Sequence, residues 1–171
     1  MDVYVLVLRL MHIIGGVFWA GGTFLVAGYI EPTARASGPE GGKFMQRFAG
    51  QSGYSQAMGI AAIANVLAGL LLYWKDSGGL QLVWITTSAG LAFTVGGLAG
   101  IAAAVVGFGM SGRAAGQLAQ VGKEIASAGG PPAPEKLAQI QALQEKLRLG
   151  GRINVVLMII ALLGMSLARY L

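Results

Sequence analysis

Charged residues and cysteine are what this sequence has least of. Only 11% of its 171 residues are Asp, Glu, Lys or Arg, and none is Cys. Soluble domains carry roughly 25% charged residues because their surfaces face water. Much of this chain's surface is therefore expected to face lipid. The absence of Cys excludes disulfides, thiolate metal sites, iron–sulfur clusters and a cysteine nucleophile.

Long apolar runs take the place of the missing charges. A membrane-spanning helix needs roughly 20 mainly apolar residues, and four stretches meet this requirement: about 3–30, 54–74, 82–110 and 153–171. The pair Glu31-Pro32 is expected to end the first of them. The third must tilt or protrude, since its helix is about 43 Å long at 1.5 Å per residue. The sequence predicts one all-α domain, an integral membrane four-helix bundle.

Positive charge indicates the orientation of these spans. Nine of the twelve Lys and Arg residues lie in the loop between the first two spans or in the loop before the last span. Because Lys and Arg collect on the cytoplasmic side, we expect a multi-pass protein of the cell's inner (plasma) membrane with both termini outside. No basic stripe with interleaved aromatic residues is present, so nucleic acid is not an expected partner.

The segment 111–152, before the last span, carries a helical pattern of its own. Gly129-Gly130-Pro131-Pro132 interrupts that pattern, and Pro134 suits a first helical position. The apolar positions at helical spacing are Leu118, Val121, Ile125, Leu137, Ile140 and Leu147. They predict a cytoplasmic helical hairpin that packs on itself or lies on the anionic inner leaflet. A docking surface for a partner is the alternative.

Small residues recur every four positions in the second and third spans. Asn65 and Gly69 belong to the strip on the second span, and Gly96 and Gly100 to the strip on the third. Such strips let membrane helices approach closely, either within the bundle or at a homo-oligomer seam. An unpaired amide is costly in lipid, so we expect Asn65 to hydrogen-bond to another helix.

His12 is the single histidine and lies inside the first span. Ionisable residues at such a depth usually face the bundle interior and are candidate functional sites. Arg9, Gly16 and Trp19 share its helical face by spacing. This arrangement fits haem b, with the imidazole on iron, glycine leaving room for the macrocycle and arginine near a propionate. Copper is the second choice, and a structural hydrogen bond to a neighbouring helix is the alternative to both.

A second histidine ligand is excluded within one chain. The sixth position of a haem iron would then be open, a His of another subunit, or a methionine. Met58 and Met165 are the candidates for that methionine.

One stretch resembles a known family. Leu8-Arg9-Leu10-Met11-His12-Ile13-Ile14-Gly15-Gly16-Val17-Phe18-Trp19-Ala20-Gly21-Gly22 resembles the first helix of the copper-resistance protein D superfamily, through an early intramembrane His followed by Trp-x-Gly-Gly. That superfamily includes small membrane proteins and is similar to the bacterial membrane-bound protoporphyrinogen oxidase. Gly150-Gly151-Arg152-Ile153-Asn154 before the last span resembles the end of short relatives. The resemblance implies a four-helix membrane domain that holds haem b or handles copper. The oxidase's further histidines are missing, so its catalysis is not carried over.

Absent motifs narrow the function further. The chain has no Walker loop, Rossmann fingerprint or His-Glu-x-x-His motif, and its carboxylates all lie at the terminus or in loops, which argues against a proton-driven transporter. We therefore expect redox or metal handling at a haem b or copper site centred on His12. The main alternative is a non-catalytic accessory subunit of a larger membrane complex. A solute or ion channel ranks third, with a lining of Thr86, Thr87, Ser88, Thr94 and Asn65.

Overall fold

The protein is helical throughout the part that the structure describes. This structure, a computed structural model, describes residues 2–129 and 131–171, with the exception of the Gln51 side chain. Within these ranges every regular element is a helix. Four continuous helical columns are long and apolar enough to cross a membrane: Val3–Ala36, Tyr54–Asp76, Ser88–Ala128 and Pro134–Tyr170. The predicted all-α bundle is confirmed at this level.

The first column runs through α1 (Val3–Leu25), the π-helix η1 (Val26–Ile30) and α2 (Glu31–Ala36). The prediction that Glu31-Pro32 ends this helix is wrong. A proline ring normally clashes with the carbonyl four residues earlier and cannot donate a backbone hydrogen bond. Here Glu31 bonds to the carbonyl of Val26, five residues back. The wider π turn accommodates Pro32, and the helix continues.

The chain then reverses into α3 (Gly38–Gln51), an amphipathic helix where the sequence analysis places only a loop. Gly38 has a φ of 60°, which favours glycine. Gly41 packs directly on the backbone of Ala34 in α2, so a Cβ there would collide with it. The spacing of Phe44 and Phe48, whose rings stack at 5.9 Å, was the local signal for this helix.

After α4 (Tyr54–Asp76), the third column begins later than predicted. The predicted start at residue 82 is wrong, because α5 (Leu82–Ile85) is a separate single turn and α6 (Ser88–Val106) follows it. Thr87 ends the interruption by accepting a hydrogen bond from the Gly90 backbone N–H at 3.0 Å, which is the usual role of an N-cap residue.

From α6 the third column continues through the π-helix η2 (Gly107–Gly112) into α7 (Arg113–Ala128). The last column is α8 (Pro134–Leu167), followed by the short 3-10 helix η3 (Ala168–Tyr170). Gly130, part of the predicted turn, lies outside the described residues. At about 1.5 Å per residue the third column is roughly 60 Å long, about twice the hydrocarbon thickness of a bilayer. Its α7 end therefore projects beyond any bilayer that holds α6.

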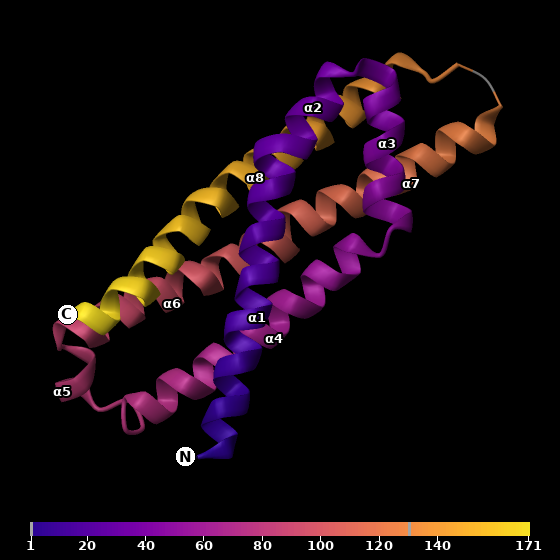
Figure 1. Ribbon diagram of the computed structural model, residues 1–171. Helices are drawn as coiled ribbons and strands as arrows, with labels where there is room; N and C mark the ends of the chain where they lie inside the picture. The colour runs from indigo at the N-terminus through magenta and orange to yellow at the C-terminus, as the bar shows by residue number, and fades with distance from the viewer. Residues whose placement is uncertain (1, 130) are drawn as a thin grey trace.

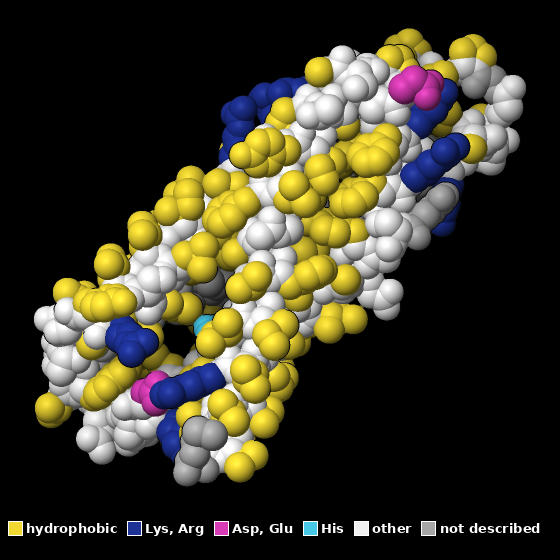
Figure 2. Space-filling view, in the orientation of Figure 1, with side chains coloured by type: hydrophobic (Ala, Val, Ile, Leu, Met, Phe, Trp, Pro, Cys, Tyr) yellow, Lys and Arg dark blue, Asp and Glu magenta, His cyan; other side chains and the backbone are white. Residues whose placement is uncertain are grey.

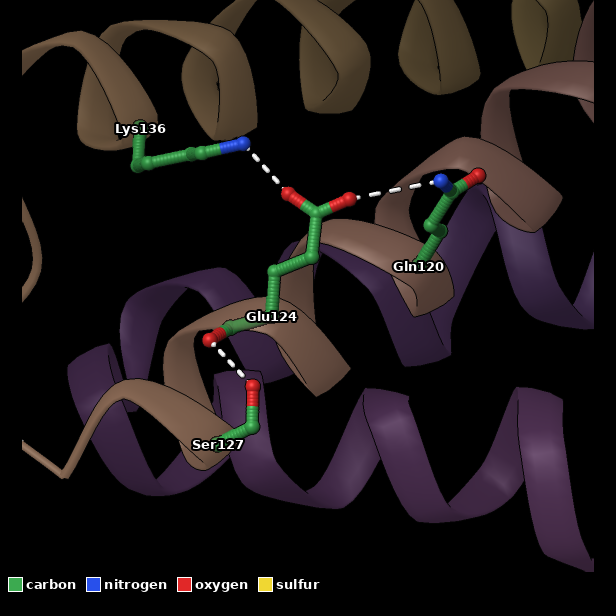
Figure 3. Close-up of polar contacts among 4 residues, drawn as sticks. All are labelled: Gln120, Glu124, Ser127 and Lys136. Atoms are coloured by element: carbon green, nitrogen blue, oxygen red, sulfur yellow. Dashed lines mark hydrogen bonds and ion pairs between the residues drawn. The ribbon is translucent and has the colours of Figure 1, made fainter.

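The two helices of this hairpin pack on one another. A buried cluster of Ala114, Val121 and Leu143 joins α7 to α8. Near the turn, Lys136 of α8 forms an ion pair with Glu124 of α7 (Figure 3). Glu124 also accepts a hydrogen bond from Gln120 at 3.3 Å, and its backbone carbonyl accepts one from Ser127 at 2.9 Å. The side of the membrane on which the hairpin lies stays a prediction.

The long columns pair α1 with α4 and α6 with α8, and both chain ends lie at the same end of the bundle (Figure 1). We call the part formed by α1, α4, α6 and residues 155–167 the membrane half. The hairpin half comprises α2, α3, α7 and residues 134–149. On the visible face, Lys and Arg side chains gather toward the two ends, and a broad hydrophobic band separates them (Figure 2). This distribution is what a membrane-spanning surface requires.

Candidate functional site

His12 lies where three helices of the membrane half meet. Its Nδ1 is 2.9 Å from the backbone carbonyl oxygen of Asn65 in α4. The Asn65 amide in turn donates to the backbone carbonyl of His12 at 2.5 Å. This reciprocal pair joins α1 to α4, so Asn65 bonds across helices as its place in the second span led us to expect. A carbonyl oxygen can only accept, so the geometry assigns the imidazole proton to Nδ1.

The other ring nitrogen faces sulfur. His12 Nε2 lies 3.4 Å from Met165 Sδ, which comes from α8. With the proton on Nδ1, Nε2 presents a lone pair, and a thioether sulfur has no proton to donate. Two electron-pair donors therefore face one another in an apolar setting. Either a second proton or a metal cation between them would turn this contact into a favourable one.

Two glycines fix the positions of these side chains. A Cβ on Gly69 of α4 would lie 2.8 Å from the His12 ring carbon Cε1, and a Cβ on Gly16 would lie 2.9 Å from the Asn65 amide nitrogen. Neither distance leaves room for a side chain. Gly16 thus accommodates the Asn65 amide, where the sequence analysis expected it to accommodate a macrocycle.

The remaining residues of the predicted His12 face lie elsewhere. Trp19 is only 6% exposed and packs in a core with Ala62 of α4, Ala103 of α6 and Met158 of α8. It therefore lies against neighbouring helices. Arg9 is exposed near the chain ends, where it lines a shallow pocket with Asp2.

Of the two candidate methionines, the structure brings only Met165 to His12. Met58 lies about three helical turns further along α1, where a Cβ on Gly22 would be 2.9 Å from its sulfur. The spacing along the first span gave no means of choosing between them. That choice depends on how α8 crosses α1.

The predicted packing glycines divide into two groups. Gly96 is buried at the crossing of α6 and α8, where its Cβ would be 3.1 Å from the carbonyl oxygen of Ala161. Gly164, which the sequence analysis missed, completes this crossing: its Cβ would lie 2.9 Å from the Gly96 Cα. The signal for it was the spacing of Ala161, Gly164 and Ala168 on one face. Gly100, by contrast, has open space around it within this chain.

A second buried amide was named in the sequence analysis only through the family resemblance. Asn154 of α8 is 7% exposed, and its Oδ1 accepts no hydrogen bond from the described residues. Gly107, the first residue of η2, lies beside its amide nitrogen, since a Cβ there would be 3.5 Å away.

The residues at His12 do not fit a haem. An iron on Nε2 needs a flat macrocycle across that nitrogen, yet Met165 sulfur lies 3.4 Å away and α4 backbone at Gly69 lies against the ring. The open groove of about 360 Å³ between α1 and α4 is lined by apolar residues such as Leu8 and Ile63, and His12 does not line it. A haem at this position would require the helices to separate.

A copper(I) ion fits the same atoms. Imidazole suits copper, and thioether sulfur selects its soft Cu(I) state. The two atoms, 3.4 Å apart, lie close enough for one ion to contact both. The described residues contain no cluster of three or more His, Cys, Asp or Glu side chains that could hold a metal. The His–Met pair is a candidate metal site on its own geometry.

The chain matches no protein-family model, no curated protein and no solved structure. Its class is therefore defined by its own architecture, a helical protein with four helices long and apolar enough to span a membrane. The likeness of residues 8–22 to the copper-resistance protein D superfamily stays a prediction.

Proposed function

We propose that this chain is a multi-pass membrane protein that binds one copper(I) ion between His12 and Met165. The observation that carries the proposal is the contact of His12 Nε2 with Met165 Sδ at 3.4 Å, two atoms that both offer electron pairs. A charged imidazolium in an apolar interior is costly, whereas a soft monovalent metal ion satisfies both atoms.

The hydrogen bond on the far side of the ring supports the same proposal. Metal-binding histidines almost always donate their other ring N–H to a carboxylate, a backbone carbonyl or water, which fixes the tautomer and ring orientation. His12 Nδ1 has this partner in the carbonyl of Asn65, at 2.9 Å. Gly69, pressed against the ring, holds the imidazole in the same place.

The ligand set also indicates the kind of chemistry. Bound copper supplies a soft cation that can exchange one electron. His12 and Met165 would hold it in place, and Trp19 with Ala62, Ala103 and Met158 forms a dry layer further in. No carboxylate is part of the His12 contacts. The arrangement therefore favours copper binding or electron exchange over hydrolysis.

The proposed setting is the plasma membrane, with both chain ends outside and the hairpin half in the cytoplasm. The support for this orientation is the excess of Lys and Arg near the hairpin half, nine of twelve along the sequence. In this orientation His12 lies in the outer part of the bilayer.

Anaerobic titration of the purified protein with Cu(I), in competition with a chromogenic chelator, tests the proposal. We expect one tightly held ion per chain and no Soret band in the absorption spectrum. Met165→Leu keeps the size of the side chain and removes the sulfur, so it should abolish this binding. Met58→Leu is the matched control, because Met58 packs beside Gly22 away from His12. Equal copper binding by the native chain and Met165→Leu would refute the proposal.

An accessory subunit of a larger membrane complex is the second candidate function. Gly97 and Gly100 of α6 have open space around them, and small residues on an outward helix face allow another membrane helix to approach closely. In this case His12 serves only to join α1 to α4 through Asn65. Purification in mild detergent should then return a stoichiometric partner, and a homogeneous monomer would contradict this candidate.

A further inference from the structure

Two of the four columns depart from regular α-helix at one level of the bundle, while the second column begins there and the last carries two glycines within regular helix. The first column has the π-helix η1 and the third has the π-helix η2. Between α3 and α4 the chain breaks at Gly53, whose φ is 72°. The last column carries the adjacent pair Gly150-Gly151. We call this level the waist and define it by residues 26–30, 52–53, 107–112 and 150–154.

Close contacts join the waist segments of the first, third and last columns. A Cβ on Gly151 would lie 3.7 Å from the Ala27 Cβ of η1. Across the other interface, a Cβ on Gly150 would collide with the Ser111 hydroxyl of η2. At the start of α4, the Tyr54 hydroxyl donates to the Gly22 carbonyl at 2.9 Å, one turn before η1. The waist is therefore one layer, where the membrane half meets the hairpin half.

Close packing explains the presence of only some of the glycines in the waist. Gly28 in η1 and Gly109 in η2 have no atom near the position that a Cβ would occupy. Glycine is among the least favourable residues in a helix because it gives up most backbone freedom on ordering. Where close contact requires glycine, as at Gly150, that cost has a structural reason. At Gly28 and Gly109 the backbone is simply left easier to deform.

The hydrogen bonding of the waist is also weak. π-helices are rare, and they occur mostly as single turns that are often found at functional sites. The described part of this chain has two, one in the first column and one in the third. Between them lies Asn154, a buried amide whose oxygen accepts no hydrogen bond from the described residues. A buried acceptor without a donor destabilises the conformation that contains it.

On either side of the waist the packing is continuous. The hairpin half has its own buried cluster of Ala114, Val121 and Leu143. The membrane half has the core around Trp19 and Met158. Two separately packed bodies are thus joined by a layer of deformable backbone.

We infer that the waist is a hinge at which the hairpin half bends relative to the membrane half. The inference does not depend on copper at His12, which lies in the membrane half well away from this layer. Bending changes the direction in which α7 and the start of α8 project, while the four membrane-half helices keep their contacts.

Distance measurements between paired spin labels test this hinge, and the cysteine-free chain makes the labelling clean. One pair joins Leu91→Cys on α6 to Gln117→Cys on α7, across η2. The reference pair joins Leu91→Cys to Val105→Cys, both on α6. All three positions are exposed. We expect a broader distance distribution for the pair across the waist. Equal widths for the two pairs would overturn the hinge.

A glycine double variant isolates the cause of that breadth. Gly28→Ala with Gly109→Ala adds two methyl groups in open space, so folding should be retained and the excess width should be lost. Gly97→Ala with Gly100→Ala is the matched control, since both positions are equally open but lie in regular helix. The hinge assignment fails if the waist variant leaves the width unchanged, or if the control narrows it as much. Asn154→Leu, which removes the unpaired amide, should also narrow the distribution.

Discussion

Within each half of this bundle, a different kind of residue holds the helices together. In the membrane half, α6 and α8 meet at Gly96 and Gly164, where backbones come close. In the hairpin half, α7 and α8 meet through larger aliphatic residues, among them Val121 and Leu143. Lipid gives helices no hydrophobic reason to associate, so close contact must hold them. Water drives the burial of large apolar groups. This difference is what one half packing in lipid and the other in water would require, and membrane insertion stays a prediction.

Polar contacts follow the same division. The hairpin half uses ion pairs between exposed side chains, such as Glu124 with Lys136 and Glu145 with Arg148. In the membrane half the contacts between helices join uncharged groups, and the ion pair of Lys75 with Asp2 lies exposed at the end near the N-terminus. The Tyr73 and Thr94 hydroxyls, for example, lie 2.6 Å apart between α4 and α6. Neutral hydrogen bonds satisfy polar groups without bringing charge into an apolar medium.

The largest expected effect comes from emptying the hairpin core. Leu143→Ala removes a side chain that is only 4% exposed, and such changes cost about 2–5 kcal/mol. We expect faster amide hydrogen exchange in α7, measured by mass spectrometry, with α6 unchanged. Leu137→Ala, at an exposed position on the same helix, is the control. Loss of protection in α6 as large as that in α7 would show that the halves unfold as one unit.

A large side chain at the crossing of α6 and α8 should destabilise the membrane half instead. Gly164→Leu drives a side chain into the backbone of Gly96 and Ala92, and overpacking typically costs about 1–3 kcal/mol. Thermal unfolding in detergent should show a lower Tm. Gly97→Leu adds the same side chain at an open position of α6 and should leave the Tm nearly unchanged. If the two variants lose equal stability, close packing at this crossing is not what holds α6 to α8.

The smallest expected effect is a pH dependence confined to the hairpin half. The hydrogen bond and charge of Lys136 lower the pKa of Glu124 below its ordinary value of 4.5. The folded hairpin therefore binds this proton less readily than the unfolded chain. Its contribution to stability is fully present above pH 4.5 and is lost as the pH falls through the lowered pKa. Because Glu124 is exposed, the effect should be slight.

Hydrogen exchange in α7 as a function of pH measures this contribution. In Glu124→Gln, the protection of α7 amides should fall less as the pH is lowered. Glu135→Gln, on the first turn of α8, should behave like the native chain. An unchanged acid limb in Glu124→Gln would mean that the pair with Lys136 does not stabilise the hairpin.

The sequence predicted the helices better than it predicted their ends. Apolar length and helical spacing were enough for the four long columns and for a helix beginning at Pro134. Pro32 misled the prediction because its tolerance depends on a π turn, which has no sequence signature of its own. The start at Ser88 was missed because Leu82–Ile85 is apolar enough to look like part of the span, although Thr87 is a recognisable N-cap.

The candidate site, too, could be predicted from the sequence only in part. A lone histidine in an apolar run is visible in the sequence, and so is an amide such as Asn65 that requires a partner. The pairing of Nδ1 with the Asn65 carbonyl and of Nε2 with Met165 is not visible, because these residues come from three helices. Local spacing likewise could not show that Met165 lies on the far side of the imidazole, where the haem expectation placed a macrocycle.

By itself, then, the sequence determined that this is a helical chain with four runs able to cross a membrane, because scarcity of charge and helical periodicity are local properties. Only the tertiary structure decided which methionine meets His12, that Gly16 accommodates Asn65, and that both π-helices and Asn154 lie in one layer. Those facts depend on how the helices cross and in what register, and close contacts between distant segments fix both.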